Sequence, residues 1–314
     1  MDADARHRTG DSGAVQDPAR LGALRGGCQV SAVTSTARRR VRSVGWHVGA
    51  LALLAVILYP VVWVIGASFK PGDKIVGSLQ LLPTDPITDN YRRLSEGIAD
   101  IPITSFFYNS LIIAVGSVVG VLFSCSLAAY AFARIRFAGR NLLFSVMIAT
   151  LLLPFQVLII PQYVLFQKLE LINTFVPLLL GKYLAVDAFF VFLLMQFMRN
   201  LPKELDEAAR IDGCGHLRIY WNIVLPLCRP ALITSAIFSF IWSWNDFIGP
   251  LLYLNTQDKY TVSLALKMFI DQDTVADYGG MVAMSLVALA PVLLFFLAFQ
   301  RYLVEGAATS GLKG

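Results

Sequence analysis

The sequence is short of charge. Only 15% of its 314 residues are Asp, Glu, Lys or Arg, whereas a soluble globular domain carries about 25%. In contrast, 56% of the residues are hydrophobic, and the mean hydropathy is +0.64. This composition excludes an ordinary soluble domain and indicates a membrane protein.

Cysteine and histidine are scarce as well. The four cysteines and three histidines show no spacing typical of a metal site, so we expect no metal ion: they are Cys28, Cys125, Cys214, Cys228, His7, His47 and His216. Disulfides are not expected either, because Cys214 and Cys228 fall on the reducing side in the orientation predicted below. Basic residues do not alternate with aromatic ones along any segment, so nothing indicates a nucleic acid partner.

Long apolar runs, by contrast, are abundant. A helix needs roughly 20 apolar residues to cross the hydrocarbon core of a bilayer. Six runs of about that length are present, at residues 45–67, 107–133, 142–166, 176–198, 231–254 and 279–303. The prediction is an all-α membrane protein with six transmembrane helices.

Prolines lie within several of these runs. We expect them to kink the helices rather than break them, because neighbouring helices and water can satisfy the freed carbonyl groups; they include Pro60, Pro154, Pro161 and Pro291. In the second run, Gly116 and Gly120 have the spacing that permits close helix approach.

The distribution of Lys and Arg orients the spans. Arginines cluster at residues 38–42, 134–140 and around 202–230, which share one side if there are six spans. The opposite loops are mixed or acidic, with several Asp residues between 255 and 278. Cytoplasmic loops carry the excess of Lys and Arg, so both termini and residues 202–230 are predicted to be cytoplasmic.

The chain divides into three parts. Residues 1–37 are rich in Gly, Ala, Arg and Asp and lack an apolar period, which predicts a disordered tail; a start codon assigned too far upstream is the alternative. Residues 38–304 form the transmembrane domain, and 305–314 form a cytoplasmic tail. No cleavable signal peptide is evident, because the first apolar run is as long as a span and lies far from Met1.

The stretch PKELDEAARIDGCGHLRIYWNIVLPLCRP, residues 202–230, places charge between two apolar runs. Pro202 suits the start of a helix, and Gly213 and Gly215 end that helix with an elbow. A second short helix is predicted from four residues spaced to form one face: Leu217, Tyr220, Trp221 and Val224. A rigid, charged unit of two short helices suits docking to another protein.

The order of residues in this stretch is distinctive. Glu207-Ala208-Ala209 is followed after three residues by Gly213, and nine residues later by Ile223-x-Leu225-Pro226. This pattern resembles the signature loop of binding-protein-dependent ABC importer permeases. PKELDEAARIDG resembles the carbohydrate subgroup, the MalG-like subunits. The resemblance covers about residues 45–314 and includes LAAYAFARIRFAGR at 127–140 and WSWNDFIGPLL at 242–252.

The resemblance implies a type I ABC importer permease fold in a bacterial inner membrane. The chain would form half of the pathway for a carbohydrate, beside a second permease subunit and membrane lipid. An ABC ATPase dimer would bind residues 202–230, here named the coupling loop, and an extracytoplasmic solute-binding protein would deliver the solute, with residues 255–278 as one contact.

The resemblance also implies roles for single residues. Glu207 would pair with a basic residue of the ATPase, Ala208 and Ala209 would allow close approach, and Gly213 would form the elbow. Ile223, Leu225 and Pro226 would complete the loop. The last four residues resemble the family's tail, which would contact the ATPase, with a frayed end as the alternative: Gly311, Leu312, Lys313 and Gly314.

ATP hydrolysis is not expected in this chain. A phosphate loop needs G-x-x-x-x-G-K-[ST] between a strand and a helix, and the nearest match, at residues 306–313, has its lysine displaced. No cofactor is therefore expected here, and ATP and Mg²⁺ would be bound by the partner ATPase.

Polar residues within the spans leave alternatives open. Trp244, Asn245 and Asp246 would either line a substrate pathway or position the helix against the second permease, because a polar pair in a span needs a cavity or a partner helix. Asp187 is a weaker candidate. An intramembrane enzyme would need convergent ionisable groups, which only Asp187 and Asp246 clearly offer. An ion-coupled carrier would leave the coupling loop without a purpose.

Overall fold

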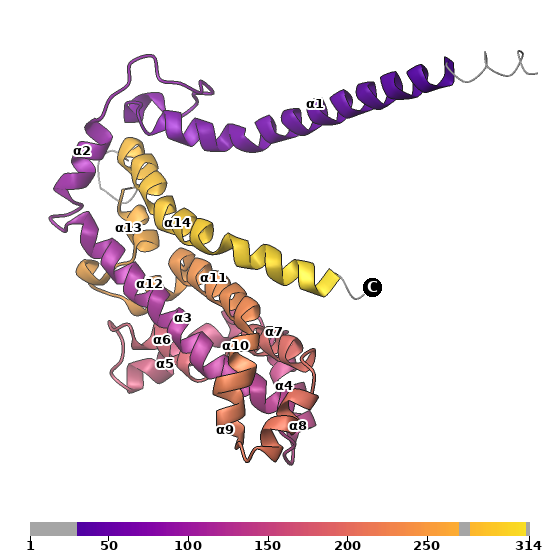
Figure 1. Cartoon of the computed structure of the whole chain (residues 1–314). Coiled ribbons are helices and arrows are strands. Elements are labelled where there is room, and N and C mark those ends of the chain that lie inside the picture. The colour runs from indigo at the N-terminus through magenta and orange to yellow at the C-terminus, as the bar shows by residue number, and fades with distance from the viewer. Residues whose placement is uncertain (1–29, 270–276, 312–314) are drawn as a thin grey trace, which may run out of the picture. The chain divides into compact units, whose positions relative to one another are not determined.

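The computed structural model describes residues 30–269 and 277–311, and side chains from 43 to 269 and from 277 to 301. The described part of the chain is helical and contains no strand, with one isolated bridge between Ile98 and Ile101 (Figure 1). It forms two compact units that divide between Val61 and Val62.

The first unit contains most of helix α1 (Val30–Ala67). The helix begins inside the stretch expected to be disordered up to residue 37, since neither Gly nor Pro occurs between residues 28 and 44 to interrupt it. Residues 1–29 lie outside the described residues. From Val44 to Val61, the apolar side chains of α1 are exposed, as expected for a helix that lipid or another subunit covers.

The second unit is built around helix α3 (Ile103–Arg134). Helices α6 (Val176–Tyr183), α7 (Ala188–Arg199) and α11 (Arg229–Asn245) pack on it, and α14 (Tyr278–Gly311) packs on α11 (Figure 1). The axis of the unit is therefore a single long helix with its neighbours around it.

Shorter elements complete the unit. They are η2 (Gly72–Lys74), α2 (Asp89–Glu96), α4 (Arg140–Thr150), α5 (Phe155–Lys168), α8 (Glu204–Ile211), α9 (His216–Ile219), η3 (Tyr220–Val224), α10 (Leu225–Leu227), α12 (Ile248–Tyr253), η4 (Gln257–Lys259) and α13 (Val262–Met268). Helices α8 and α9 lie at the opposite end of the unit from α2 and α13 (Figure 1).

Close approach between α3 and α6 depends on two glycines. A Cβ added to Gly116 would lie 3.0 Å from a methyl carbon of Leu179, and one added to Gly120 would lie 2.9 Å from the ring of Tyr183. The helices therefore meet where the sequence has no side chain, which confirms the predicted role of this glycine pair.

Among the described residues, four helical segments are long and apolar enough to cross a membrane: Ser43–Ala67, Ile103–Arg134, Val176–Arg199 and Tyr278–Arg301. Two bent pairs also qualify, α4 with α5 at 102° and His216–Leu227 with Arg229–Asn245 at 78°. Counting each pair as one span gives six, the predicted number.

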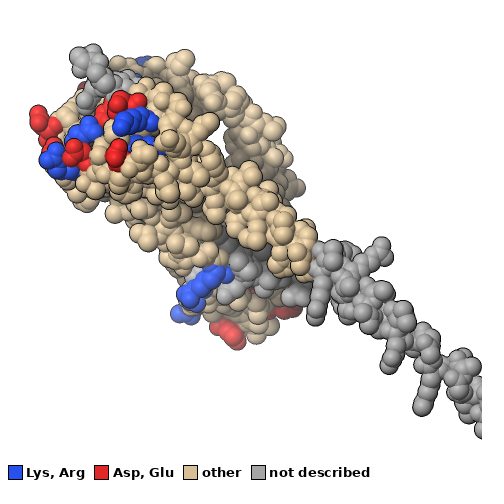
Figure 2. Space-filling model, turned by 90° about the horizontal axis from the view of Figure 1, so that it is seen from above, with Lys and Arg blue, Asp and Glu red and all other residues tan. Residues whose placement is uncertain are grey.

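Figure 2 shows one face of the molecule, where charged side chains gather in groups and the surface between them carries none.

The effect of proline differs from span to span. Pro60, Pro161 and Pro291 lie within continuous helices, as predicted. The expectation was wrong for Pro154, which precedes α5 in an extended conformation with ψ 134°. Because proline disfavours a helical conformation at the residue before it, the helix breaks over residues 151–154 and turns by 102°.

The fourth and fifth predicted spans are also interrupted. Asp187 does not lie within a helix, because α6 ends at Tyr183 and α7 begins at Ala188. The fifth span does not continue to residue 254: Asp246 is extended with ψ 122°, and its carboxylate accepts a hydrogen bond from the Gly249 N–H at 3.1 Å. That bond supports the start of α12, so the apolar run makes two helices.

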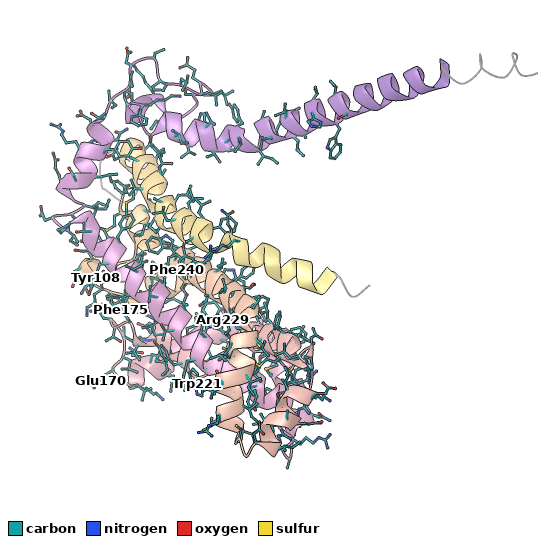
Figure 3. All side chains as sticks on the ribbon, in the orientation of Figure 1. Tyr108, Glu170, Phe175, Trp221, Arg229 and Phe240 are labelled. Carbon is teal, nitrogen blue, oxygen red and sulfur yellow. The ribbon has the colours of Figure 1, made fainter. Side chains whose placement is uncertain are left out.

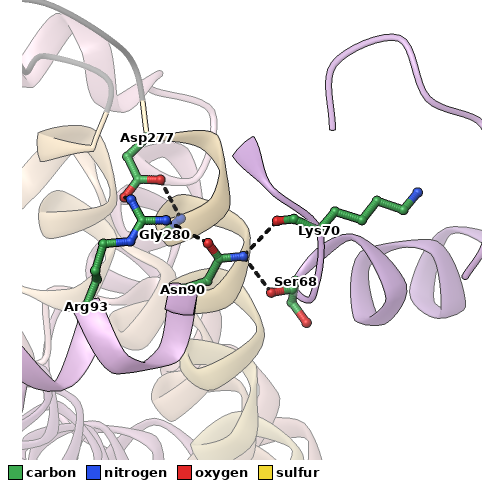
Figure 4. Close-up of polar contacts among 6 residues, drawn as sticks. All are labelled: Ser68, Lys70, Asn90, Arg93, Asp277 and Gly280. Atoms are coloured by element: carbon green, nitrogen blue, oxygen red, sulfur yellow. Dashed lines mark hydrogen bonds and ion pairs between the residues drawn. The ribbon is translucent and has the colours of Figure 1, made fainter. Parts of the chain in front are cut away.

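Away from the coupling loop, a buried amide joins three segments of the second unit (Figure 4). The Asn90 side chain donates to the carbonyl oxygens of Ser68 at 2.8 Å and Lys70 at 2.9 Å. Arg93 donates to the Asn90 amide oxygen at 2.8 Å and pairs with Asp277 at 3.0 Å. Asn90 is fully buried, and its hydrogen bonds fix this end of the unit.

Candidate functional site

Helix α8 and the turn that ends it form the first half of the coupling loop. Gly213 has φ +78°, a left-handed conformation that glycine adopts without strain. Around it, the Gly213 N–H bonds to the Arg210 carbonyl at 3.0 Å, and the Cys214 N–H bonds to the Ala209 carbonyl at 2.9 Å. The predicted elbow is confirmed at Gly213. Gly215 has φ −76°, which any residue can adopt.

The two faces of α8 are different. Asp206 and Ala209 are 5% and 6% exposed and face the body of the protein. Glu207 and Ala208 are exposed. Ala209 therefore packs within this chain, and Glu207 and Ala208 are the residues of α8 in the signature that a partner can reach.

The second half of the loop turns a different face inward from the predicted one. Ile219, Tyr220 and Val224 are buried, whereas Leu217 and Trp221 are 70% and 51% exposed. The predicted face of Leu217, Tyr220, Trp221 and Val224 was wrong in two of its four residues. A π-helical turn spans Tyr220–Val224, and this wider turn, together with the packing of Tyr220 on α3, sets which residues face inward.

The loop is fastened to α3 by a stripe of polar side chains. Ser126, Tyr130 and Arg134 lie four residues apart, so they share one face of the helix. The Ser126 hydroxyl lies 2.6 Å from that of Tyr220, and the Tyr130 hydroxyl lies 3.3 Å from Nδ1 of His216. The rings of Tyr130 and Tyr220 also contact each other, with centroids 5.3 Å apart.

The third contact of this stripe is a buried charge. The Arg134 guanidinium donates to the Leu201 carbonyl at 2.8 Å, and its Nε lies 3.5 Å from Oδ2 of Asp206. The two charged side chains are only 3% and 7% exposed. Arg134 therefore holds both the chain entering the loop and helix α8.

Apolar packing fixes the rest of the loop. Ile223 and Leu225 are half-buried against the core formed by α3, α7 and the loop. Pro226 is exposed in the first turn of α10. Trp221 lies in the loop before α10, Arg229 lies where the loop joins α11, and Phe240 lies farther along that helix (Figure 3).

Trp244, Asn245 and Asp246 do not form one cluster. Trp244 is 3% exposed, and its indole N–H donates to the Ala288 carbonyl at 3.1 Å, which ties α11 to α14. Asn245 is exposed and donates to the Ile241 carbonyl at 2.8 Å in its own helix. Asp246 is an exposed residue whose carboxylate accepts the bond that supports α12.

Two predicted contact regions, the C-terminal tail and the outer segment 255–278, extend beyond the described residues. Gly311 is the last described residue of α14, and residues 312–314 lie outside the described residues. Residues 270–276 of the outer segment lie outside them too.

Asp187 makes an ion pair with Lys182 at 2.9 Å, so it has a partner within its own chain.

Sequence reasoning missed Ser126, Tyr130, Arg134 and Asp206. The sequence held a signal for Asp206 alone. Asp206 lies three residues before Ala209 in the predicted helix, so the two share a face that differs from the face of Glu207. Charged residues near a span were assigned to solvent, however, because composition alone cannot show that a cation and an acid far apart in the sequence meet in the interior.

The chain matches the family described as binding-protein-dependent transport system inner membrane component over residues 116–308, which include the coupling loop. It is 34% identical over 272 residues to the arabinooligosaccharides transport system permease protein AraQ of Halalkalibacterium halodurans, covering 85% of this chain and 95% of the relative. It is 33% identical over 257 residues to the diacetylchitobiose uptake system permease protein NgcG of Streptomyces coelicolor, covering 82% and 84%.

A third relative is the galactooligosaccharides transport system permease protein GanQ of Bacillus subtilis, 32% identical over 265 residues, with 84% and 93% covered. Among solved structures, the chain is similar to one from the crystal structure of a bacterial ABC transporter involved in the import of the acidic polysaccharide alginate. The TM-score is 0.72 at 23% identity, covering 84% of this chain and 96% of that one. This likeness confirms the predicted fold.

Proposed function

Because the chain belongs to the family of binding-protein-dependent transport system inner membrane components, we propose that it is the permease subunit of an ATP-driven importer whose solute is a carbohydrate. The curated relatives named above are permeases for arabinooligosaccharides, diacetylchitobiose and galactooligosaccharides, and the chain aligns with most of their lengths. The ion-coupled carrier and the intramembrane enzyme are not favoured by this membership.

The other subunits follow from the same reasoning. A second permease would complete the pathway, an extracytoplasmic solute-binding protein would deliver the solute, and an ABC ATPase dimer would bind ATP and Mg²⁺. The exposed apolar residues of α1 between Val44 and Val61 support contact with lipid or with the second permease. The arginines near the coupling loop support a cytoplasmic position for it and for both termini.

The coupling loop would dock with the exposed face of α8. Glu207 would pair with a basic residue of the ATPase, Ala208 would allow close approach, and Gly213 would set the elbow. Ala209 instead packs inside this chain. Leu217 and Trp221 are exposed beyond the elbow and would enlarge the contact.

The observation that carries this proposal is the stripe on α3. At successive turns of one helix, Ser126 contacts Tyr220, Tyr130 contacts His216 and Arg134 contacts Asp206, three separate parts of the loop. A force applied to the loop would thus reach α3, on which α6, α7 and α11 pack. ATP would drive transport by favouring one of two packings of these helices, since a ligand shifts an equilibrium by binding the two states unequally.

Roles remain for the polar residues of the fifth apolar run and for the tail. Asn245 and Asp246 are exposed and would line the pathway or contact the second permease. Trp244 would act indirectly, by holding α11 on α14. The residues from Gly311 to the end would reach the ATPase.

The test is co-purification from the native membrane in mild detergent, with the recovered proteins identified by mass spectrometry. The wild-type chain should carry an ABC ATPase and a second permease, and Glu207→Lys should lose the ATPase and keep the permease. Glu204→Lys is the matched control, because Glu204 is an exposed acid one turn earlier in α8. Recovery of this chain alone, or equal loss of the ATPase in both variants, would refute the proposal.

A further inference from the structure

A cavity of about 770 Å³ lies between the coupling loop and the ends of the apolar helices. Three of its arginines mark those ends: Arg134 is the last residue of α3, Arg199 is the last of α7, and Arg140 is the first of α4. Helix ends of this kind lie where the hydrocarbon core gives way to lipid headgroups. The cavity therefore lies at headgroup level.

The charge of the cavity is strongly unbalanced. Asp206 and Glu207 are its acids, whereas six cations line it: Arg134, Arg136, Arg140, Arg199, Lys203 and Arg210. In the described part of the chain, the side chains of Arg136, Lys203 and Arg210 make no hydrogen bond or ion pair, and the Arg199 guanidinium lies over the ring of Phe144 at 5.5 Å. Most of the positive charge is thus uncompensated within the chain.

Two buried nitrogens of Arg134 in the cavity make no hydrogen bond. The Arg134 side chain is 3% exposed; its Nη1 has no partner and its Nε has only the 3.5 Å ion pair with Asp206, whereas Nη2 bonds to the Leu201 carbonyl. A buried polar group without a partner is rare and is costly to leave unpaired. Oδ1 of Asp206 also lacks a partner, so Asp206 compensates Arg134 only through its other oxygen. The free guanidinium edge is a donor ready for an acceptor.

We propose that this cavity binds a phosphate-bearing anion, and that its source is the headgroup of an anionic phospholipid in the cytoplasmic leaflet. Arginine donates paired hydrogen bonds to phosphate oxygens, which suits a site with several guanidinium groups. Anionic headgroups bind basic pockets between transmembrane helices on this side of a membrane. The bound lipid would join the coupling loop to the ends of α3 and α7.

Lipid binding is measured by native mass spectrometry on the intact complex, stripped of lipid and titrated with phosphatidylglycerol or phosphatidylcholine. The double variant Arg136→Gln/Arg199→Gln should bind phosphatidylglycerol about 25-fold more weakly, at about fivefold for each arginine near an anionic surface. Both residues are exposed, so their loss should leave the fold intact. Arg136→Lys/Arg199→Lys should keep most of the affinity, because the charge remains.

Arg218→Gln/Arg229→Gln is the matched control, since both arginines are exposed in the same loop and do not line the cavity. It should bind phosphatidylglycerol as tightly as the wild type does. A third titration uses inorganic phosphate alone. Phosphate binding that depends on Arg136 and Arg199, without phosphatidylglycerol binding, would support the anion site and refute a lipid source. If Arg136→Gln/Arg199→Gln binds phosphatidylglycerol as tightly as the control variant does, and if phosphate binding does not depend on Arg136 and Arg199, the proposed site is wrong.

Discussion

The buried pair of Arg134 and Asp206 is the most consequential contact between the coupling loop and α3. The side chains are 3% and 7% exposed, and Nε of one lies 3.5 Å from Oδ2 of the other. In Asp206→Leu, the guanidinium keeps its bond to the Leu201 carbonyl and loses its counter-charge.

The expected magnitude follows from this burial. Breaking a buried ion pair by removing one partner costs about 3–5 kcal/mol, because the other charge stays uncompensated. Arg134→Met should cost a similar amount. The double variant Arg134→Met/Asp206→Leu removes both charges and leaves the Leu201 carbonyl without its donor, a penalty of about 1–3 kcal/mol. The two substitutions should therefore be far from additive, with the double variant more stable than either single one.

Hydrogen exchange of the α8 amides in the purified complex measures this effect, because it reports local opening. A loss of about 3 kcal/mol should speed exchange by more than about a hundredfold. Asp212→Leu is the control, since Asp212 is an exposed acid at the end of the same helix. Exchange in Asp206→Leu within about threefold of the wild type, or additive losses in the double variant, would refute the buried pair.

Two further predictions concern the elbow and the thiols. Gly213→Ala should lower the stability of the loop by about 1–2 kcal/mol, because φ is +78°, and should speed hydrogen exchange of the Cys214 amide roughly tenfold. Gly215→Ala should change this exchange little, because Gly215 has φ −76° and open space around it. Equal effects of the two substitutions would contradict the elbow at Gly213. In a Cys28→Ser background, a maleimide should label Cys214 in native vesicles opened to the cytoplasmic side and should leave Cys228 unlabelled. Cys228 is fully buried, so the reagent cannot reach its thiol; labelling of Cys228 before denaturation would contradict the packing of the loop.

Features set by local chemistry could be predicted from the sequence. The elbow at Gly213 follows from the preference of glycine for left-handed backbone. The close approach at Gly116 and Gly120 follows from the absence of a side chain. The six apolar runs are visible because hydropathy depends on composition alone.

Features set by tertiary contacts could not be predicted. A hydropathy window does not show that the Asp246 carboxylate supports a new helix at α12. Nor could it show that Tyr220 would face inward and Trp221 outward, since packing on α3 decides that. Arg134 carries a charge into the interior because Asp206 meets it there, and that pairing joins segments far apart in the sequence.

In the proposed mechanism, the coupling loop passes the movement of the ATPase to α3. The amount of solute imported per ATP hydrolysed by the reconstituted complex measures this transfer directly. Tyr220→Phe removes the 2.6 Å contact with Ser126, whereas Tyr91→Phe removes a tyrosine–serine bond of 2.8 Å to Ser68 elsewhere in the unit. Tyr220→Phe should lower this ratio with the ATPase still bound, and Tyr91→Phe should leave it unchanged. The same ratio in both variants and in the wild type would show that the loop does not act on α3 through this contact.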